Sequence, residues 1–335
     1  MNPKELKKIL TTMVEERLPI LLKGAPGVGK TDIVKQVAEE LKMELLVSRP
    51  VVSDPTDFKG LPGIVKGKAE FLPFGDLRQL VETTEPTIAF LDDLGQAPAM
   101  VQAAAMQLIL ARQVNGHKIS KKVVFVAATN RREDRAGVTG VLEPVKSRFT
   151  SILELTPDAD SWIEWAFEND MPAEIIGFIH FRPSLLITNE KTADIVNHPC
   201  PRTIAHAGTI IAMADFKKFS DKTQMELLAG AVGEGCAVEL LGFIKVYNEL
   251  PNISAILTDP ESAKVPKDPA ALWAVVSALV DKVTVDSIDR IMTYGNRLPS
   301  EYNIMLIRDA VRKVPKIQQT KAFTKWAIKN QDFML

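Results

Sequence analysis

The stretch LPILLKGAPGVGKTDIVKQVAEELKM, residues 18–43, decides the fold of this chain. It starts with a short apolar run, passes through a glycine-rich segment and continues with apolar residues at helical spacing. Gly24, Gly29, Lys30 and Thr31 fit the pattern GxxxxGK[ST], which forms a phosphate-binding loop between a buried strand and a helix. Because the strand before the loop and the helix after it are both predicted, the pattern favours a nucleotide site over a simple glycine-rich turn.

The chemistry of such a loop assigns a task to each residue type. Glycines allow backbone N–H groups to point at phosphate oxygens, and the N-terminus of the following helix adds its positive dipole end. Lys30 would reach the β- and γ-phosphates, and the hydroxyl of Thr31 would bind Mg²⁺. The residues predicted to surround the phosphates are Gly24, Ala25, Pro26, Gly27, Val28, Gly29, Lys30 and Thr31.

A second apolar run, in TIAFLDDLGQAP (residues 87–98), ends in the adjacent acids Asp92 and Asp93. Side-by-side carboxylates repel each other unless a cation neutralises them. A P-loop enzyme holds its Mg²⁺ with an acid that ends a second strand. Asp92 is therefore predicted to hold Mg²⁺, and Asp93 to orient or deprotonate the attacking water. Asp93 also suits a helix cap, and the two roles can coexist.

Five apolar runs alternate with helical segments in the first half of the chain, which is typical of an α/β fold with a parallel sheet covered on both faces. They are residues 18–24, 44–50, 87–91, 123–130 and 151–157. After residue 157 the pattern predicts helices and no strand. We expect an α/β nucleotide-binding domain over 1–156, a helical domain over 157–250 and a C-terminal helical extension over 251–335, with proline-rich residues 251–270 as the linker.

Composition excludes several other classes of protein. The 335 residues carry 41 basic and 42 acidic side chains, so the chain is no general binder of nucleic acid. Two cysteines without a CxxC pair argue against a zinc site or a disulfide framework. No apolar run reaches the ~18 residues of a membrane span, and the charged start MNPKELKKIL lacks the core of a signal peptide. We expect a cytoplasmic protein.

Together these motifs resemble the AAA+ ATPase superfamily, with GAPGVGKT as its Walker A motif and FLDDLGQAP as its Walker B motif. VVFVAATN resembles the sensor 1 strand, which implies that Asn130 lies beside the γ-phosphate of ATP. PVKSRF resembles the segment that carries the arginine finger, which implies that Arg148 reaches a neighbouring subunit's site. PCPRTIAHAG resembles the start of the sensor 2 helix, which implies that Arg202 approaches the phosphates from a helical lid.

Two further stretches are similar to the MoxR branch of that superfamily. Residues 54–77 resemble its hairpin insertion in helix 2, with a turn at Lys66-Gly67-Lys68. Residues 111–122 resemble the hairpin before sensor 1, where Asn115-Gly116 is a strong type I′ turn signal. In the family such hairpins face the central pore of a ring.

The resemblance implies a Mg-ATP-dependent ring ATPase, a hexamer of bacterial or phage type, with chaperone-like activity that remodels or activates a partner protein. The partner of such proteins often carries a von Willebrand factor A domain. One alternative is a nucleic-acid motor or clamp-loader-like factor of phage replication or packaging. Its phosphate contacts would come from the hairpin lysines Lys66, Lys68, Lys118, Lys121 and Lys122. Another alternative is a nucleotide switch that binds ATP without hydrolysing it.

Two departures from the family pattern affect the chemistry. The family has Asp-Glu in Walker B, whereas this chain has Asp92-Asp93, and Gly95 occupies the position of the family's asparagine. A carboxylate shorter by one methylene predicts slow hydrolysis or a compensating backbone. We expect Asp93→Glu to raise turnover, and lower turnover would show a site that is already built around aspartate.

The arginines also allow plainer interpretations. Arg148 could close a salt bridge near the strand at 151–155. The run Arg131, Arg132 and Arg135 is typical of a solvated surface, although one of the three could face a neighbour's nucleotide. Arg202 opens a helix, where a cation opposes the helix dipole. That position favours an anion nearby.

Overall fold

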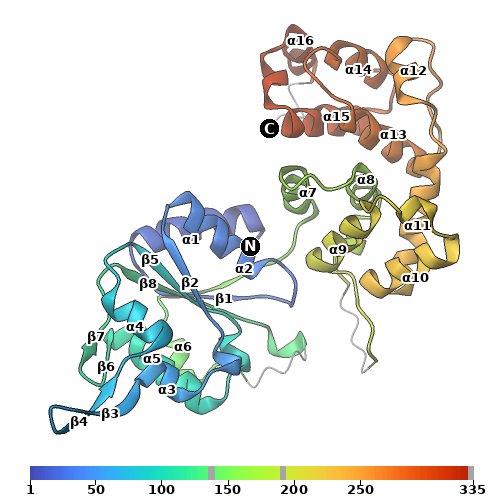
Figure 1. Ribbon diagram of the computed structural model, residues 1–335. Helices are drawn as coiled ribbons and strands as arrows, with labels where there is room; N and C mark the ends of the chain where they lie inside the picture. The colour runs from blue at the N-terminus through green and yellow to red at the C-terminus, as the bar shows by residue number, and fades with distance from the viewer. Residues whose placement is uncertain (135–139, 189–193, 331–335) are drawn as a thin grey trace. The chain divides into compact units, whose positions relative to one another are not determined.

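The computed structural model describes residues 1–134, 140–188 and 194–330 of the chain (Figure 1). The chain divides into two compact units, Met1–Pro157 and Asp158–Leu335. Within the described residues, no helix is both long enough and apolar enough to cross a membrane.

The first unit is built on a five-stranded sheet with the order β2-β5-β8-β1-β9. Every neighbouring pair in this sheet is parallel. The five apolar runs form these strands, so the predicted α/β fold is confirmed. Their bounds are β1 (Ile20–Lys23), β2 (Glu44–Ser48), β5 (Thr87–Leu91), β8 (Val123–Thr129) and β9 (Ser151–Glu154).

Helices cover both faces of the sheet, with α1 and α2 on one side and α5 and α6 on the other (Figure 1). Side chains alternate between the two faces, so Leu21 and Phe125 join the core against α5. β5 and β8 are buried along their whole length. The bounds are α1 (Pro3–Glu15), α2 (Lys30–Glu40), α3 (Pro55–Lys59), α4 (Gly75–Glu82), α5 (Ala99–Ala111), α6 (Glu143–Lys146), η1 (Pro50–Val52), η2 (Leu94–Gln96) and η3 (Arg132–Asp134).

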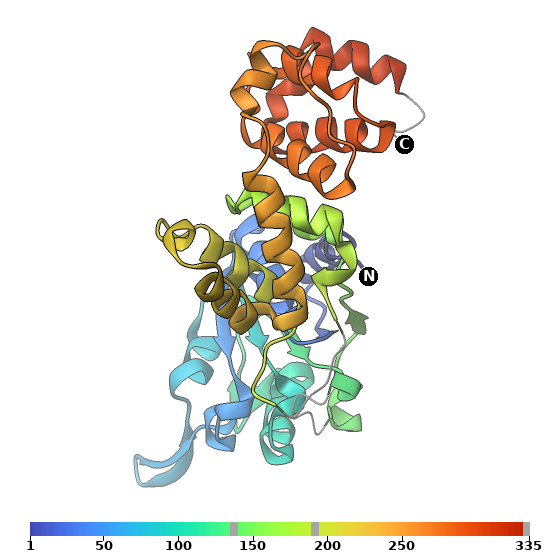
Figure 2. The same cartoon turned by 90° about the vertical axis from the view of Figure 1, so that its right-hand side faces the viewer.

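Two hairpins extend from the α/β core: β3 (Leu61–Val65) with β4 (Lys68–Leu72), and β6 (Gln113–Val114) with β7 (His117–Lys118). Figure 2 shows the first as a blue loop that projects away from the sheet. Asn115 and Gly116 have φ of 47° and 87°. Positive φ at both central residues is what a type I′ turn requires, as predicted.

Side chains of the second hairpin contact helix α3 and the first hairpin. The side-chain amide of Asn115 donates to the carbonyl oxygen of Lys59 at 2.8 Å. The Nε2 atom of His117 lies 2.6 Å from the carbonyl oxygen of Phe71. The two hairpins therefore form one structural platform on the first unit.

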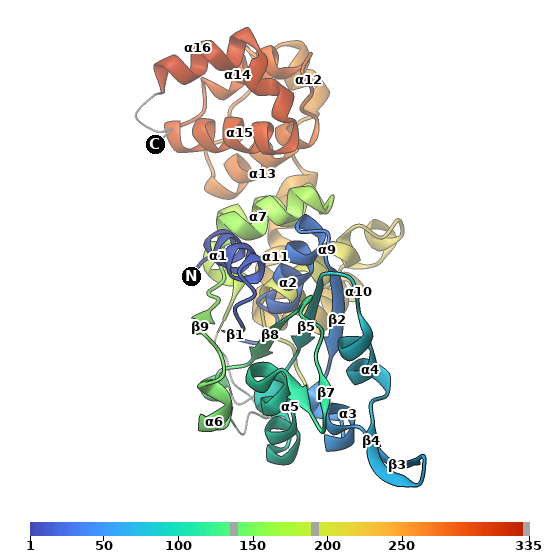
Figure 3. The same ribbon diagram turned by 90° about the vertical axis from the view of Figure 1, so that its left-hand side faces the viewer.

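The second unit contains only helices among its described residues. One apolar core joins α7 to α11, and another joins α12 to α16, with α13 contributing to both (Figure 3). The bounds are α7 (Ala159–Glu168), α8 (Ala173–Phe181), η4 (Pro183–Leu186), α9 (Pro201–Ile211), η5 (Phe216–Lys218), α10 (Asp221–Val232), α11 (Glu234–Asn248), α12 (Ile253–Thr258), α13 (Pro269–Asp281), α14 (Ile288–Gly295), α15 (Ser300–Lys313), η6 (Pro315–Gln319) and α16 (Lys321–Lys329).

The predicted linker, residues 251–270, is partly packed into this unit. Ile256 of α12 is buried in the second apolar core. The boundary at residue 250 stays a prediction.

A buried polar cluster connects α8 with α15. The Nε2 atom of His180 lies 2.6 Å from Oδ2 of Asp309, and both side chains are almost fully buried. Arg312 pairs with Oδ1 of the same carboxylate at 3.0 Å. The ring of His180 stacks on Trp273 of α13, with ring centroids 5.0 Å apart. The cluster therefore joins helices of both apolar cores.

Candidate nucleotide-binding site

The loop between β1 and α2 depends on its glycines. Gly27 and Gly29 have φ of 74° and 98°, in the left-handed region that glycine enters without steric cost. A Cβ at Gly24 would lie 2.9 Å from the carbonyl oxygen of Leu155. The glycines thus allow the loop to turn tightly and let α2 begin at Lys30.

Lys30 is buried and bound by its own loop. Its Nζ donates to the carbonyl oxygens of Gly24 at 2.9 Å and Ala25 at 3.0 Å. It also donates to Oδ1 of Asn130 at 2.7 Å. The structure therefore brings the predicted loop lysine and the predicted sensor asparagine into direct contact, although they are 100 residues apart.

Thr31 and Asp92 meet at the carboxyl end of the sheet. The hydroxyl of Thr31 donates to Oδ2 of Asp92 at 3.0 Å. Mg²⁺ prefers oxygen ligands and is usually held by one or two carboxylates together with substrate phosphates. A hydroxyl beside a carboxylate at the start of α2 fits this requirement. No group of three or more His, Cys, Asp or Glu side chains gathers at metal distance within the described residues.

Asp93 sits on a turn in the left-handed region, with φ of 58° and ψ of 34°. It precedes η2, but its side chain makes no capping hydrogen bond to that helix. Its Oδ1 atom accepts instead from the amide of Gln96 at 2.7 Å and from the amide of Asn130 at 3.5 Å. Lys30, Asn130 and Asp93 are thus joined in one hydrogen-bonded chain.

Gln96 did not emerge from the sequence, because no motif singles it out. A usable signal was its spacing of three residues from Asp93, because residues three apart eclipse in a 3₁₀ turn. The structure also explains why position 95 is glycine, where the family that the motifs resemble has asparagine. A Cβ at position 95 would collide with Oγ1 of Thr129. β8 therefore excludes any larger residue at that position in the present packing.

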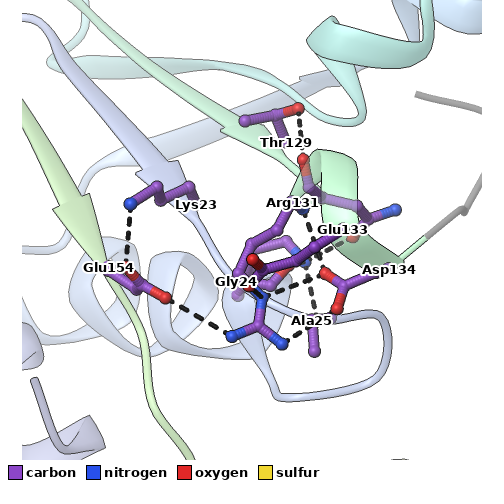
Figure 4. A network of polar contacts seen from close by, with 10 residues as sticks. Lys23, Gly24, Ala25, Thr129, Arg131, Glu133, Asp134 and Glu154 are labelled. Carbon is purple, nitrogen blue, oxygen red and sulfur yellow. Dashed lines mark hydrogen bonds and ion pairs between the residues drawn. The ribbon is translucent and has the colours of Figure 1, made fainter. Parts of the chain in front are cut away.

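Arg131 belongs to a network of charges within the first unit (Figure 4). Its guanidinium bonds Asp134 at 2.9 Å and lies 3.5 Å from Glu154. Lys23 pairs with Glu154 at 2.8 Å, and this hydrogen bond is the main reason that the pKa of Glu154 lies below its ordinary value. The hydrogen bond from Arg131 to Asp134 raises the pKa of Arg131. These contacts favour a structural role for Arg131.

The other arginines differ from Arg131. Arg148 is half-buried after α6, and Arg202 is exposed in the first turn of α9. Neither side chain forms a hydrogen bond or ion pair with another described residue, so Arg148 lacks the salt bridge considered from the sequence. Arg132 is exposed, and Arg135 lies outside the described residues.

Comparison with known proteins bears on the unit that carries this site. Residues 20–156 match the family described as "ATPase family associated with various cellular activities (AAA)". These residues form an AAA ATPase-family domain. The curated relative "ATPase family gene 2 protein homolog B" of Homo sapiens is 34% identical over 116 residues. That match spans 33% of this chain and 15% of the length of the relative.

Among solved structures, the chain is similar to the RuvB Holliday junction branch migration motor of Thermotoga maritima. The TM-score is 0.43 at 17% identity, with 82% of this chain and 81% of the other covered. It is also similar to a putative ATPase from Cytophaga hutchinsonii, with a TM-score of 0.35 at 14% identity, covering 92% and 80%. NtrX from Brucella abortus, in complex with ADP, gives a TM-score of 0.42 at 10% identity, covering 99% and 68%.

Proposed function

We propose that this chain is a Mg-ATP-dependent ring ATPase of the MoxR type. It assembles as a hexamer and couples ATP hydrolysis to chaperone-like remodelling or activation of a partner protein. One observation carries the catalytic part of the proposal. Lys30, Asn130 and Asp93 form a continuous hydrogen-bonded chain, next to the paired oxygens of Thr31 and Asp92.

Each residue of this constellation has a role in ATP binding. The loop from Gly24 to Thr31 surrounds the phosphates with backbone N–H groups. Lys30 turns from Oδ1 of Asn130 toward the β- and γ-phosphates, and the side-chain N–H group of Asn130 donates to the γ-phosphate. Thr31 and Asp92 would hold Mg²⁺, which would neutralise charge on the phosphate oxygens.

Hydrolysis is an in-line attack of water on the γ-phosphorus. The new P–O bond forms as the bond to the β,γ-bridging oxygen breaks, and ADP leaves with that electron pair. Asp93 orients the water and accepts its proton. Because its carboxylate is one methylene shorter than glutamate, and a misplacement of about 1 Å can cost ~100-fold in rate, turnover is slow.

Two arginines complete the site. Arg148 is the finger that reaches the nucleotide of the neighbouring subunit, where it stabilises charge in the transition state. Such fingers contribute about 10³ to 10⁵ in rate. Arg202 approaches the phosphates from the helical unit. The absence of a protein partner for either side chain among the described residues agrees with these roles.

The hairpin platform is the proposed surface for the client protein. In the register of β3 and β4, Pro62 pairs with Phe71 and Ile64 with Ala69, so all four share one face. All four are exposed, and Ile64 is 82% exposed. Exposed apolar patches mark interaction sites. This face favours a client protein, or a partner with a von Willebrand factor A domain, over the nucleic-acid alternative.

The nucleic-acid alternative rests on the exposed lysines of both hairpins, Lys66, Lys68, Lys118, Lys121 and Lys122. Binding through phosphates would weaken steeply with rising salt. Titration of labelled DNA and RNA at low and moderate salt separates the two functions. No binding at low salt removes the alternative.

Steady-state ATP turnover per subunit, measured against protein concentration with Mg²⁺, tests the proposed function. Lys30→Ala is the blank because it removes the phosphate-binding ammonium. We expect turnover per subunit to rise with concentration and then saturate, since the site is completed between subunits. Turnover at the blank level with ATP still bound would identify a nucleotide switch instead.

A further inference from the structure

The turn after β5 brings a second side chain onto Asp93. The backbone N–H of Gln96 donates to the carbonyl oxygen of Asp93 at 3.0 Å, which closes one 3₁₀ turn. Residues three apart eclipse in such a turn. The amide of Gln96 consequently lies over the carboxylate of Asp93 and donates to Oδ1 at 2.7 Å. Oδ2 of Asp93 makes no hydrogen bond to any described residue.

The Gln96 side chain makes a poor structural element by itself. Its Oε1 atom is buried and has no hydrogen-bond partner among the described residues. A buried polar atom without a partner destabilises the fold, because it has lost its hydrogen bonds to water. Gln102 offers a contrast on the same unit, because its amide donates to Ala97 and Gly140 and its oxygen accepts from the backbone of Leu142.

We propose that Gln96 is a positioning residue for hydrolysis and acts through Asp93. It fixes Oδ1, so that Oδ2 is turned toward the attacking water in one orientation. Asn130 cannot do this alone, because its amide is 3.5 Å from Oδ1 while its oxygen accepts from Lys30. This inference rests on the proposed ATPase function. It explains why Asp93 is one methylene shorter than glutamate, because the lengths of Asp93 and Gln96 match each other.

The pairing of Gln96 with Asp93 predicts that Gln96→Asn lowers kcat in the natural chain but not in the Asp93→Glu background. In the natural chain the shorter amide no longer reaches Oδ1, so kcat falls about tenfold or more because the carboxylate loses its orientation. In the Asp93→Glu variant the longer carboxylate collides with the side chain of Gln96. The shorter side chain of Gln96→Asn leaves room for it. There, Gln96→Asn leaves kcat unchanged or raises it. The Kd for ATP stays within about twofold in every variant, since the phosphate contacts are untouched.

Two controls separate positioning from folding. Gln107→Ala, an exposed glutamine on α5, removes an amide far from Asp93 in the chain and keeps the natural kcat. Gln96→Met keeps the side-chain length but removes both the donor and the unpartnered acceptor. We expect it to lower kcat by a similar factor while the melting temperature stays the same or rises. If the role of Gln96 were purely structural, Gln96→Met would lower the melting temperature.

The decisive measurement is kcat for the natural chain, Gln96→Asn, Asp93→Glu and the double variant, with ATP affinity measured alongside. A lower kcat for Gln96→Asn in the natural chain, with an unchanged or higher kcat in the Asp93→Glu background, supports the inference, and a larger fall in the Asp93→Glu background contradicts it. The same factor in both, or less than a twofold change in the natural chain, overturns it and leaves the ATPase proposal intact. If the natural chain hydrolyses no more ATP than Lys30→Ala, the proposed function and this inference fall together.

Discussion

A side chain at position 95 would collide with the strand that carries Asn130. The nearest atom to a Cβ there is Oγ1 of Thr129, followed by the Cβ of the same residue at 3.2 Å. Overpacking of this kind costs about 1–3 kcal/mol. We therefore expect Gly95→Ala to lower the free energy of unfolding by that amount in urea titrations.

The same geometry supplies a compensating change. Thr129→Ala removes the Oγ1 atom, so in that background Gly95→Ala should cost clearly less than in the natural chain. Equal costs in the two backgrounds would show that Thr129 yields by rotating and that another contact requires glycine.

Cys236 predicts a loss of stability at alkaline pH. Burial raises the pKa of its thiol to about 12 in the folded chain, whereas an unfolded thiol ionises near ~8.5. The folded pKa is the higher one, so the stabilisation is complete below about pH 8.5 and is lost as the pH rises toward 12. Each unit in that window costs about 1.4 kcal/mol.

Thermal melts of the natural chain and Cys236→Ala between pH 8 and pH 10 measure this effect. The cavity left by alanine gives a constant offset, so the natural chain should lose stability faster as the pH rises. Parallel curves would contradict the prediction. Tyr247, whose pKa burial also raises, is present in both proteins and cancels.

Motifs predicted which residues gather at the site better than they predicted how those residues touch. The pattern GxxxxGK[ST] and the two acids after an apolar run led to Lys30, Thr31 and Asp92, which the structure brings together with Asn130. Gln96 escaped because its contact depends on a left-handed residue and a single 3₁₀ turn. The catalytic roles of all these residues stay predictions.

At the scale of elements, the contact between α8 and α15 carries the largest predicted energy. His180 and Arg312 share the buried carboxylate of Asp309. Removing one member of a buried ion pair costs about 3–5 kcal/mol, because the remaining charge stays buried without compensation. Asp309→Ala should therefore destabilise the helical unit by that amount.

Urea unfolding followed by tryptophan fluorescence reports on this contact, since Trp273 stacks on His180. Asp286→Ala is the matched control, because it removes an exposed aspartate. Exposed substitutions usually change stability by less than about 0.5 kcal/mol. A loss below about 1 kcal/mol in Asp309→Ala would mean that the cluster relaxes or admits water.

Strand positions were predictable because the apolar runs have clear ends: β1, β5 and β8 are followed by glycine, aspartate and asparagine, and the runs that contain β2 and β9 end at prolines. The ends of elements were less predictable: the helical spacing in residues 18–43 indicates a helix that continues to residue 43, but α2 ends at Glu40, and Lys42 follows with φ of 52°. The contact between α8 and α15 was out of reach, since it joins residues 129 positions apart and no local pattern encodes the pairing.

For the whole molecule, the sheet order β2-β5-β8-β1-β9 has a functional consequence. It puts β1, β5 and β8 side by side, so the residues after these three strands meet at one edge. Ligands bind at the carboxyl ends of strands in open parallel sheets. Alternation of strands and helices predicted the layers, but it did not predict the order of strands, which rests on long-range pairing.

The ring assembly predicts that two inactive variants restore activity when mixed. Lys30→Ala cannot bind the phosphates but keeps Arg148, and Arg148→Ala keeps a complete loop but lacks the finger. In a mixed ring, an interface works when an Arg148→Ala subunit receives the arginine of a Lys30→Ala neighbour. Random mixing of equal amounts makes roughly one quarter of the head-to-tail interfaces productive.

Turnover should therefore stay at the blank level for either variant alone and reach a maximum when the two are mixed in near equal amounts. The concentration should be high enough to saturate assembly, because a dissociated subunit has no neighbour to supply the finger. Activity that stays at the blank level at every ratio, with mixed assemblies verified by light scattering and pull-down, would assign Arg148 to its own subunit. The finger would then have to come from another arginine, and exposed Arg132 would be the first to test.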